Sequence, residues 1–333
     1  MPFARRSWHE AASQVAGEWL FGTVAGRLLG GASTAYVLGG TLVVFGAFFW
    51  ALVYLFRLAR DLTGDEEAAR GAVWFVAAYP FALFFSALYT ESIFLLGATG
   101  AFYHFRRREF ARAAAWGLLA GFTRPNGCFL SIPLGLLAAS SWWAARSRSD
   151  QFGGPDASGE HIANRRLGTL GALGAAAMPG LAALLYSAYI WNLTGQPLTW
   201  VQGQAAWGRD YNGLAILLKD RYTWIADEGL YAYTSQLPLD LLNGLGAGFV
   251  ILAAYPIARR VGVAYAVFVL MNILPPLAAG GLLSAGRLSS VLFPAFIWLG
   301  AAVPVAQRPA WLASFMAVQA LNAALFYTWR PLY

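Results

Sequence analysis

The sequence predicts an all-α protein, a polytopic bundle of about nine transmembrane helices, and three observations lead to this fold class. First, 59% of the 333 residues are apolar and only 12% are charged, whereas roughly a quarter of the residues in a soluble domain are charged. Second, long apolar segments follow one another along the chain. Third, arginines gather in alternate loops. Backbone polar groups in lipid must be paired within a segment, so the spanning segments are expected to be helices.

Segments of about 17 to 25 apolar residues can cross a bilayer as helices. Such segments lie near residues 34–56, 71–89, 170–191, 237–257, 262–282, 288–306 and 310–328. Two further regions are expected to cross the membrane. One is a short helix over 91–105, and the other is a hairpin of two helices over 113–145 that is split by a polar run. Within the segment 262–282, Asn272 and the pair Pro275-Pro276 suggest a broken helix, which either lines a groove for a lipid substrate or is a packed kink.

The arginine-rich loops predict the orientation, because cytoplasmic loops of membrane proteins carry an excess of Lys and Arg. These loops contain Arg57, Arg60, Arg70, Arg106, Arg107, Arg108, Arg112, Arg146, Arg148, Arg165, Arg166, Arg259, Arg260 and Arg308. The opposite side then carries the turns at Glu91, Arg124 and Arg287 and the segment 192–236. Because the arginines and the net charge of +7 are explained by topology, no nucleic-acid partner is expected.

Three stretches fall outside the apolar segments. Residues 1–33 contain no span and are expected to be extracytoplasmic or interfacial, ahead of the bundle over 34–333. Residues 146–168 are rich in Gly, Ser and charge and are expected to form a flexible cytoplasmic linker. Residues 192–236 combine many Trp and Tyr with charged residues. This composition favours the headgroup level, where the segment can roof a site; a plain aromatic belt is the alternative.

Metal-ligating residues are few. Cys128 is the only cysteine, and His9, His104 and His161 are widely separated. The sequence therefore predicts neither a disulfide within the chain nor a metal centre, and no cofactor is expected.

Two polar runs interrupt the apolar sequence on the expected extracytoplasmic side. Residues 89–92 read YTES, and residues 123–127 read TRPNG. A carboxylate and a guanidinium at the mouths of apolar helices are costly to hold near a bilayer, so such residues are usually kept for a function. These runs are therefore the first candidates for a functional site.

Four ordered motifs contain or follow these runs. They read AYPFALFFSALYTESIF over 78–94; GFTRPNG over 121–127; TGQPL over 194–198 with QAAWGR over 204–209; and GRL over 286–288 leading to Phe293-Pro294. On these motifs, the chain from about residue 34 onward resembles the PIG-V-type mannosyltransferases, which are similar to GPI mannosyltransferase 2 and add the second mannose to GPI-anchor precursors, together with their bacterial relatives.

The resemblance implies a membrane-embedded glycosyltransferase with the C-type architecture. Its donor would be polyprenyl-phosphate-mannose on the extracytoplasmic side, and its acceptor a lipid-linked molecule or a glycan. The motif positions imply substrate contacts by Tyr89, Asn126, Gln204 and Trp207. The family carries a Trp-Asp loop between its first two helices, whose aspartate is the expected base. This chain begins after that loop, so a chain shortened at its N-terminus is expected.

Sugar transfer from a lipid phosphate has simple chemical requirements. A base must take the proton of the acceptor hydroxyl, positive charge must stabilise the departing phosphate, and no acid is required. Arg124, Arg209 and Arg287 lie on the expected active side, and the guanidinium fork suits phosphate oxygens. These arginines are therefore candidates for binding the donor phosphate. The alternative is that each snorkels to the membrane interface.

Glu91 and Asp210 are the candidate catalytic carboxylates. Glu91 can instead begin the following helix and interact with its dipole, or it can orient Arg124 or the acceptor. Asp210 follows Arg209 and precedes a turn, so a local ion pair is an equal alternative for it.

Two other functions remain open alongside the mannosyltransferase. One is a catalytically incomplete relative or partner subunit that lacks the N-terminal catalytic loop. The other is a lipid or solute transporter. Transporters are expected to show related halves with broken helices at matching positions, and no repeat relates the halves of this sequence.

Overall fold

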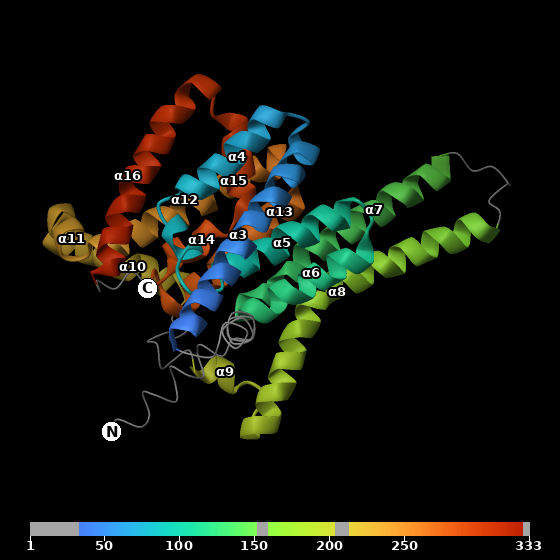
Figure 1. Ribbon diagram of the computed structural model, residues 1–333, viewed down its shortest axis with the longest axis horizontal. Coiled ribbons are helices and arrows are strands. Elements are labelled where there is room, and N and C mark those ends of the chain that lie inside the picture. The colour runs from blue at the N-terminus through green and yellow to red at the C-terminus, as the bar shows by residue number, and fades with distance from the viewer. Residues whose placement is uncertain (1–32, 152–158, 204–212, 329–333) are drawn as a thin grey trace. The chain divides into compact units, whose positions relative to one another are not determined.

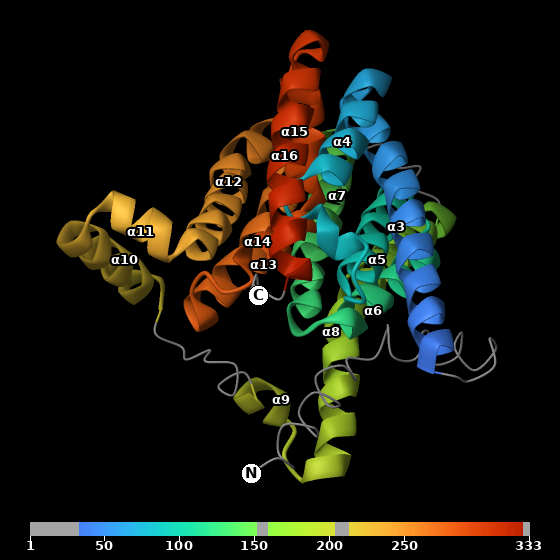
Figure 2. The same cartoon turned by 60° about the vertical axis from the view of Figure 1, so that its left-hand side comes forward.

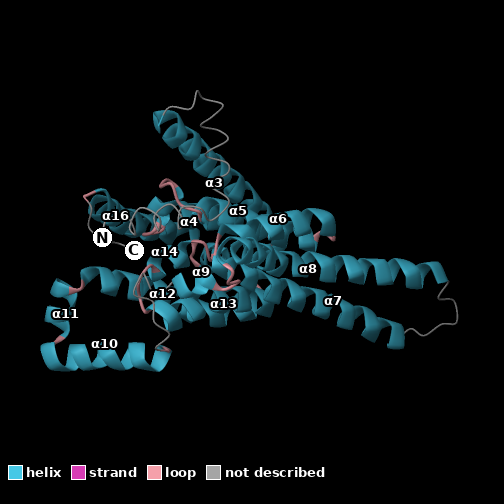
Figure 3. Cartoon of the chain, turned by 90° about the horizontal axis from the view of Figure 1, so that it is seen from below, coloured by secondary structure: helices cyan, strands magenta, loops and turns pink. Residues whose placement is uncertain are grey.

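The computed structural model describes residues 33–151, 159–203 and 213–328 (Figure 1). All regular elements within these ranges are helices, and Figure 3 shows helices joined by loops, without a strand. The all-α prediction is therefore confirmed for the described part of the chain. The chain divides into two compact units, Met1–Leu58 with Ser92–Leu184 and Ala59–Glu91 with Leu185–Tyr333.

The first unit is packed through small residues. Its elements are most of α3 (Ser33–Thr63), α5 (Glu91–Arg106) from Ser92 onward, α6 (Phe110–Thr123), the 3-10 helix η2 (Pro125–Leu130), α7 (Ser131–Gln151) and most of α8 (Gly159–Thr194). A Cβ added at Gly97 of α5 would lie 2.9 Å from the backbone N of Ala120 on α6. A Cβ at Gly121 of α6 would lie 2.5 Å from the carbonyl oxygen of Pro179 on α8. Glycine thus lets these helix backbones approach closely.

The second unit contains the longer series of elements. They are α4 (Glu66–Ala78), η1 (Ala82–Phe85), α9 (Thr199–Gln202), α10 (Leu214–Glu228), α11 (Leu230–Gln236), α12 (Pro238–Arg260), α13 (Val263–Gly280), α14 (Ala285–Ser290), α15 (Phe293–Ala302), η4 (Val305–Gln307) and α16 (Arg308–Tyr327). Figures 1 and 2 both show α15 beside α4. A Cβ at Gly300 of α15 would lie 2.2 Å from the carbonyl oxygen of Ala68 on α4. Arg308 ties the same two helices together, donating to the carbonyl oxygens of Glu67 and Gly300 at 2.9 Å each.

Several predicted segments coincide with helices of the structure. The segment 91–105 is α5, and the region 113–145 is the expected pair of helices, with η2 between them. In the segment 262–282, helix α13 runs without interruption from Val263 to Gly280, so the break expected at Pro275-Pro276 is not found. The amide nitrogen of Asn272 donates to the carbonyl oxygen of Phe268 at 2.9 Å, within the helix.

The predicted helix over 71–89 is wrong in its second half. Helix α4 ends at Ala78, and residues 79–90 form an irregular stretch around the short η1. Tyr79 adopts an extended ψ of 141°. It precedes Pro80, whose ring disfavours the helical conformation of the residue before it. The proline therefore ends the helix inside an apolar run.

The predicted helix over 288–306 is also divided. Helix α14 ends at Ser290, and α15 begins at Phe293 with Pro294 in its first turn. A proline in the first turn of a helix loses no intrahelical hydrogen bond, because the N–H groups there have no partner within the helix. The break thus places polar backbone inside an otherwise apolar part of the unit.

The stretches expected outside the bundle contain helix as well. Helix α7 reaches Gln151 and α8 begins at Gly159, so both ends of the expected linker 146–168 are helical. Residues 152–158 lie outside the described part of the chain. The segment 192–236 contains the end of α8 and the helices α9, α10 and α11.

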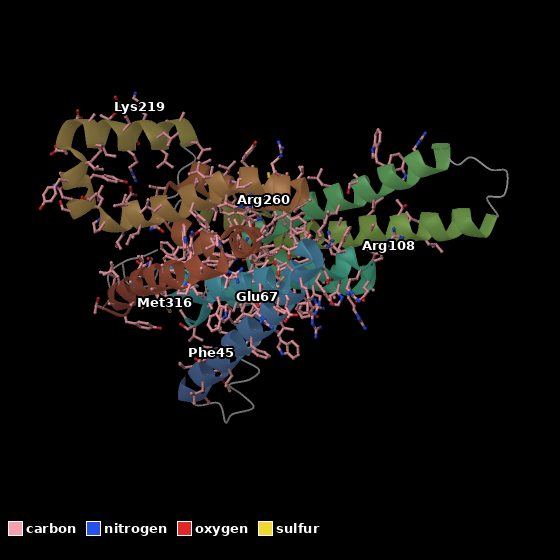
Figure 4. All side chains as sticks on the ribbon, turned by 90° about the horizontal axis from the view of Figure 1, so that it is seen from above. Phe45, Glu67, Arg108, Lys219, Arg260 and Met316 are labelled. Carbon is pink, nitrogen blue, oxygen red and sulfur yellow. The ribbon has the colours of Figure 1, made fainter. Side chains whose placement is uncertain are left out.

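Four described helices are long and apolar enough to cross a membrane. They lie over Ala35–Thr63, Leu167–Thr194, Pro238–Arg260 and Val305–Tyr327. Val263–Ala279 and Phe293–Ala302 are shorter apolar helices. Large apolar side chains such as Leu42 and Phe45 are exposed along α3, and Phe45 is labelled in Figure 4. Surfaces of this kind are expected where lipid covers a protein. These helices indicate a membrane protein, while the count of about nine passes remains a prediction.

Candidate functional site

An ion pair joins two of the predicted site residues within the second unit. Oε1 of Glu91 lies 3.3 Å from Nε of Arg287. The pair is enclosed: Glu91 is 2% exposed and the side chain of Arg287 is 19% exposed. Glu91 is the first residue of α5 and Arg287 lies on α14. Two polar turns that are far apart in the sequence therefore meet in one charged pair.

Aromatic rings surround the guanidinium of Arg287. Its Cζ atom lies 4.9 Å from the ring centroid of Tyr89 and 5.8 Å from that of Phe84. The rings of Phe84 and Tyr89 meet edge-on at 5.6 Å, and Phe326 packs against both. Cation–π contacts of this kind hold an arginine in place while its N–H groups remain able to donate. Tyr89, predicted as a substrate contact, is half-buried here and lies against Arg287.

Helix α14, which carries Arg287, is fixed by buried polar contacts. The backbone N–H of Gly286 donates to Oδ1 of Asn243 at 2.8 Å. The hydroxyl groups of Tyr79 and Ser289 are hydrogen-bonded at 2.8 Å. A Cβ at Gly286 would lie 2.1 Å from the ring of Phe81, so only glycine fits at this position without a shift. The position of Arg287 is thus determined by α12, by α14 and by the irregular stretch after α4.

Arg124 is buried separately, within the first unit. It ends α6 with an extended backbone (φ −163°, ψ 156°) that its successor Pro125 favours. Arg124 is only 7% exposed, and its Cζ atom lies 4.5 Å from the ring centroid of Phe94. The N–H of Gly127 donates to the carbonyl oxygen of Arg124 at 2.9 Å and closes the turn. This burial distinguishes Arg124 from a snorkelling arginine, whose charged head reaches water.

One of the other predicted site residues lies in the described part of the chain, and four do not. Asn126 is half-buried in η2, beside Arg124 in the sequence. Four predicted residues lie outside the described part of the chain: Gln204, Trp207, Arg209 and Asp210.

A further charged cluster involves the segment 192–236, which is rich in Trp and Tyr. Arg221 of α10 holds Asp240 of α12 with two hydrogen bonds, Nε to Oδ2 at 2.6 Å and Nη2 to Oδ1 at 2.9 Å. The hydroxyl of Tyr233 on α11 also donates to Oδ2 of Asp240. Burial, together with this hydrogen bond, raises the pKa of Tyr233 to about 12. The hydrogen bond to Asp240 raises the pKa of Arg221. The cluster thus connects three helices of the segment.

A buried histidine marks the turn between α5 and α6, on the expected cytoplasmic side. Nδ1 of His104 lies 2.6 Å from Oε2 of Glu109, and its Nε2 lies 3.0 Å from the hydroxyl of Tyr54. Arg112 donates to Glu109 at 3.0 Å. The hydrogen bonds from His104 and then from Arg112 lower the pKa of Glu109. These contacts stabilise the turn.

Sequence reasoning missed the residues that hold Arg287 in place. Asn243 is the only amide side chain in the helix Pro238–Arg260, and this isolation in an apolar helix was a usable signal. Tyr79 lies in the first motif, but its partner Ser289 is not predictable because pairing across the fold leaves no local pattern. No group of three or more His, Cys, Asp or Glu side chains that could hold a metal ion occurs among the described residues.

Comparison of the chain with protein-family models, with curated proteins and with solved structures finds no match.

Proposed function

We propose that the protein is a membrane-embedded mannosyltransferase that uses polyprenyl-phosphate-mannose as donor and a lipid-linked molecule or a glycan as acceptor. The observation that carries this proposal is the enclosed Glu91–Arg287 pair, with its guanidinium against Tyr89 and Phe84. An arginine held in this way beside apolar helices is suited to a phosphate that arrives on a lipid.

The placement of the motifs supports the proposal. The motif over 78–94 contains the end of α4 and the irregular stretch after it, and the motif over 121–127 contains the end of α6. The motif that begins at Gly286 contains the break between α14 and α15. Irregular backbone among apolar helices is tolerated where it is buried in protein or lines a cavity, and broken helices often carry substrate sites. All three motifs therefore fall where a site is favoured.

The proposed reaction is a displacement at the sugar. The oxygen of the acceptor hydroxyl forms a bond to C1 of mannose, and the bond from C1 to the phosphate oxygen breaks. The phosphate leaves with the bonding electron pair as polyprenyl phosphate, and the hydroxyl proton passes to a base. Arg287 supplies positive charge to the departing phosphate in this proposal, and a preformed guanidinium stabilises charge that develops in the transition state.

The contact with Arg287 bears on the role of Glu91. A carboxylate in contact with a guanidinium can orient its partner. In the proposal, Glu91 therefore positions Arg287, and it also begins α5, where a negative charge interacts favourably with the helix dipole. Asp210 remains the candidate base from the sequence.

The experiment compares two arginine variants of the purified protein in liposomes. Radiolabelled polyprenyl-phosphate-mannose is supplied with a membrane lipid extract as the source of acceptor, and both donor binding and label transfer are measured. Arg287→Ala is expected to weaken donor binding at least ten-fold, because a hydrogen bond to a charged group contributes about 1.5–3 kcal/mol. The control is Arg70→Ala, whose exposed side chain pairs with Glu66 and Glu67.

The outcomes separate the three candidate functions. Transfer by the wild type and by Arg70→Ala, with loss in Arg287→Ala, supports the mannosyltransferase. Donor binding without transfer would contradict it in favour of an incomplete relative or a partner subunit. Movement of intact donor across the bilayer would contradict it in favour of a transporter.

A further inference from the structure

Helix α10 is attached at two points to the same end of a helix pair. The backbone N–H of Gly213, just before α10, donates to the carbonyl oxygen of Ala278 in the last turn of α13 (3.1 Å). Arg221 binds Asp240 in the first turn of α12. Helices α12 and α13 are in contact and joined by a two-residue turn, so they run antiparallel. The start of α12 and the end of α13 therefore lie together, and α10 extends across them.

This attachment fixes the level of α10 relative to a bilayer. Helix α12 is one of the helices long and apolar enough to span, and α13 is a shorter apolar helix. The ends of such helices lie at the membrane surface. Because α10 is held at both of these ends, it is expected to lie along the surface rather than across the membrane.

The helical period divides α10 into faces, since successive residues are rotated by about 100°. Leu217, Arg221 and Trp224 face the rest of the unit: Leu217 lies near Gly281, and Trp224 meets the ring of Tyr233 at 5.5 Å. The face away from the unit carries Lys219, Asp220, Thr223 and Asp227, with the exposed side chain of Ile216 among them. Figure 4 shows Lys219 on the edge of α10 that is turned away from α12.

Between these two faces runs an apolar stripe. Leu214, Leu218, Tyr222 and Ile225 follow one another at helical spacing. Leu218 is 69% exposed and Tyr222 is 75% exposed, so no part of the described chain covers the middle of the stripe. The next helix, α11, adds exposed Leu230 and Tyr231.

We propose that α10 is an interfacial anchor whose stripe, defined by Leu214, Leu218, Tyr222 and Ile225, is buried in the lipid of the membrane surface. A helix with one polar and one apolar face lies in the interface in this way, and tyrosine favours the headgroup level. The bilayer is favoured over a second copy of the chain as the partner because the attachments to α12 and α13 already place α10 at the membrane surface. The proposal depends on membrane insertion and not on the proposed sugar transfer.

Spin labelling tests the proposal on the whole chain. Cys128 is the only cysteine, so a Cys128→Ser background accepts one label at a time. Leu218→Cys and Tyr222→Cys place labels on the stripe, and Thr223→Cys places a matched label on the polar face of the same helix. The labelled proteins are reconstituted in phosphatidylcholine vesicles, and relaxation is measured with oxygen, which partitions into lipid, and with a water-soluble nickel chelate.

The expected result is a contrast between the two faces. The labels at 218 and 222 should respond mainly to oxygen, and the label at 223 mainly to the nickel chelate. Equal exposure of all three labels to the nickel chelate would overturn the proposal. Strong dipolar broadening at 218 that grows with protein density would also overturn it, because a second copy of the chain would then occupy the stripe. Measuring two stripe positions guards against a single variant that fails to fold.

Discussion

The fit of Gly286 against Phe81 makes a quantitative prediction for Gly286→Ala. The added Cβ would lie 2.1 Å from the ring, whereas ordinary contact begins at 3.4 Å. The ring or α14 must therefore move by the difference, 1.3 Å. Phe81 is buried against Tyr79, and α14 is held by its bond to Asn243. Neither partner can move without breaking contacts.

The expected loss of stability follows from these contacts. Overpacking of this kind costs about 1–3 kcal/mol, and the higher helix propensity of alanine offsets up to about 1 kcal/mol. A net loss of about 1 kcal/mol corresponds to a Tm lowered by about 2–4 °C in a folding unit of roughly 150–250 residues. The melting of the purified protein in detergent can be followed by tryptophan fluorescence. Displacement of α14 is also expected to weaken binding of a lipid phosphate by Arg287.

Gly248→Ala is the matched control, because a Cβ at Gly248 has nothing within 4 Å. This variant gains the same propensity without a clash, so its Tm should equal or exceed that of the wild type. Phe81→Leu should partly rescue Gly286→Ala, because a smaller side chain leaves room for the methyl group and the two changes are then not additive. A Tm of Gly286→Ala equal to that of Gly248→Ala would refute the reasoning.

Three other predictions follow from contacts in the structure. Gly300→Ala should lower the Tm by several degrees in the same fluorescence assay, because its Cβ would lie 2.2 Å from a carbonyl oxygen of α4; an unchanged Tm would exclude that packing. Burial and the Asp240 carboxylate raise the pKa of Tyr233 to about 12, so its contribution to stability should be complete below pH 10 and be lost as the pH rises through about 12. The difference in ultraviolet absorbance between the wild type and Tyr233→Phe should show that titration, and a midpoint near 10 would contradict it. The hydrogen bond from His104 lowers the pKa of Glu109. The contribution of Glu109 to the free energy of unfolding should therefore be present above the ordinary pKa of glutamate and be lost as the pH falls through the lowered pKa. Glu109→Gln should reduce this loss of stability in acid, as measured by melting curves at several pH values, and identical curves for the two proteins would argue against it.

Local chemistry explains which parts of the fold could be predicted from the sequence. The apolar composition and the arginine-rich loops predict a helical membrane protein because lipid requires backbone pairing within each segment. The interruption at Arg124 was predictable from Pro125 and Gly127. Pro80 equally indicates that α4 ends near Tyr79, but the apolar composition of residues 71–89 predicts one continuous helix. Proline is not sufficient by itself, because Pro275 and Pro276 lie inside the continuous helix α13.

The site was predictable only as a set of residues. The polar turns identified Glu91, Arg124 and Arg287, because charges among apolar helices are costly. The pairing of Glu91 with Arg287 was not predictable, since it joins elements that only the fold brings together. The same holds for the bond between Tyr79 and Ser289, which positions α14. Such contacts depend on tertiary packing and leave no spacing in the sequence.

The central claim is that the bond between mannose and the lipid phosphate is broken and the sugar is transferred. The most direct measurement is a mass balance by mass spectrometry after the protein acts on polyprenyl-phosphate-mannose in liposomes with a membrane lipid extract. We expect equal molar amounts of mannosylated acceptor and free polyprenyl phosphate from the wild type, and a loss of both products in Arg287→Ala. Recovery of all the donor intact from the wild type would contradict it.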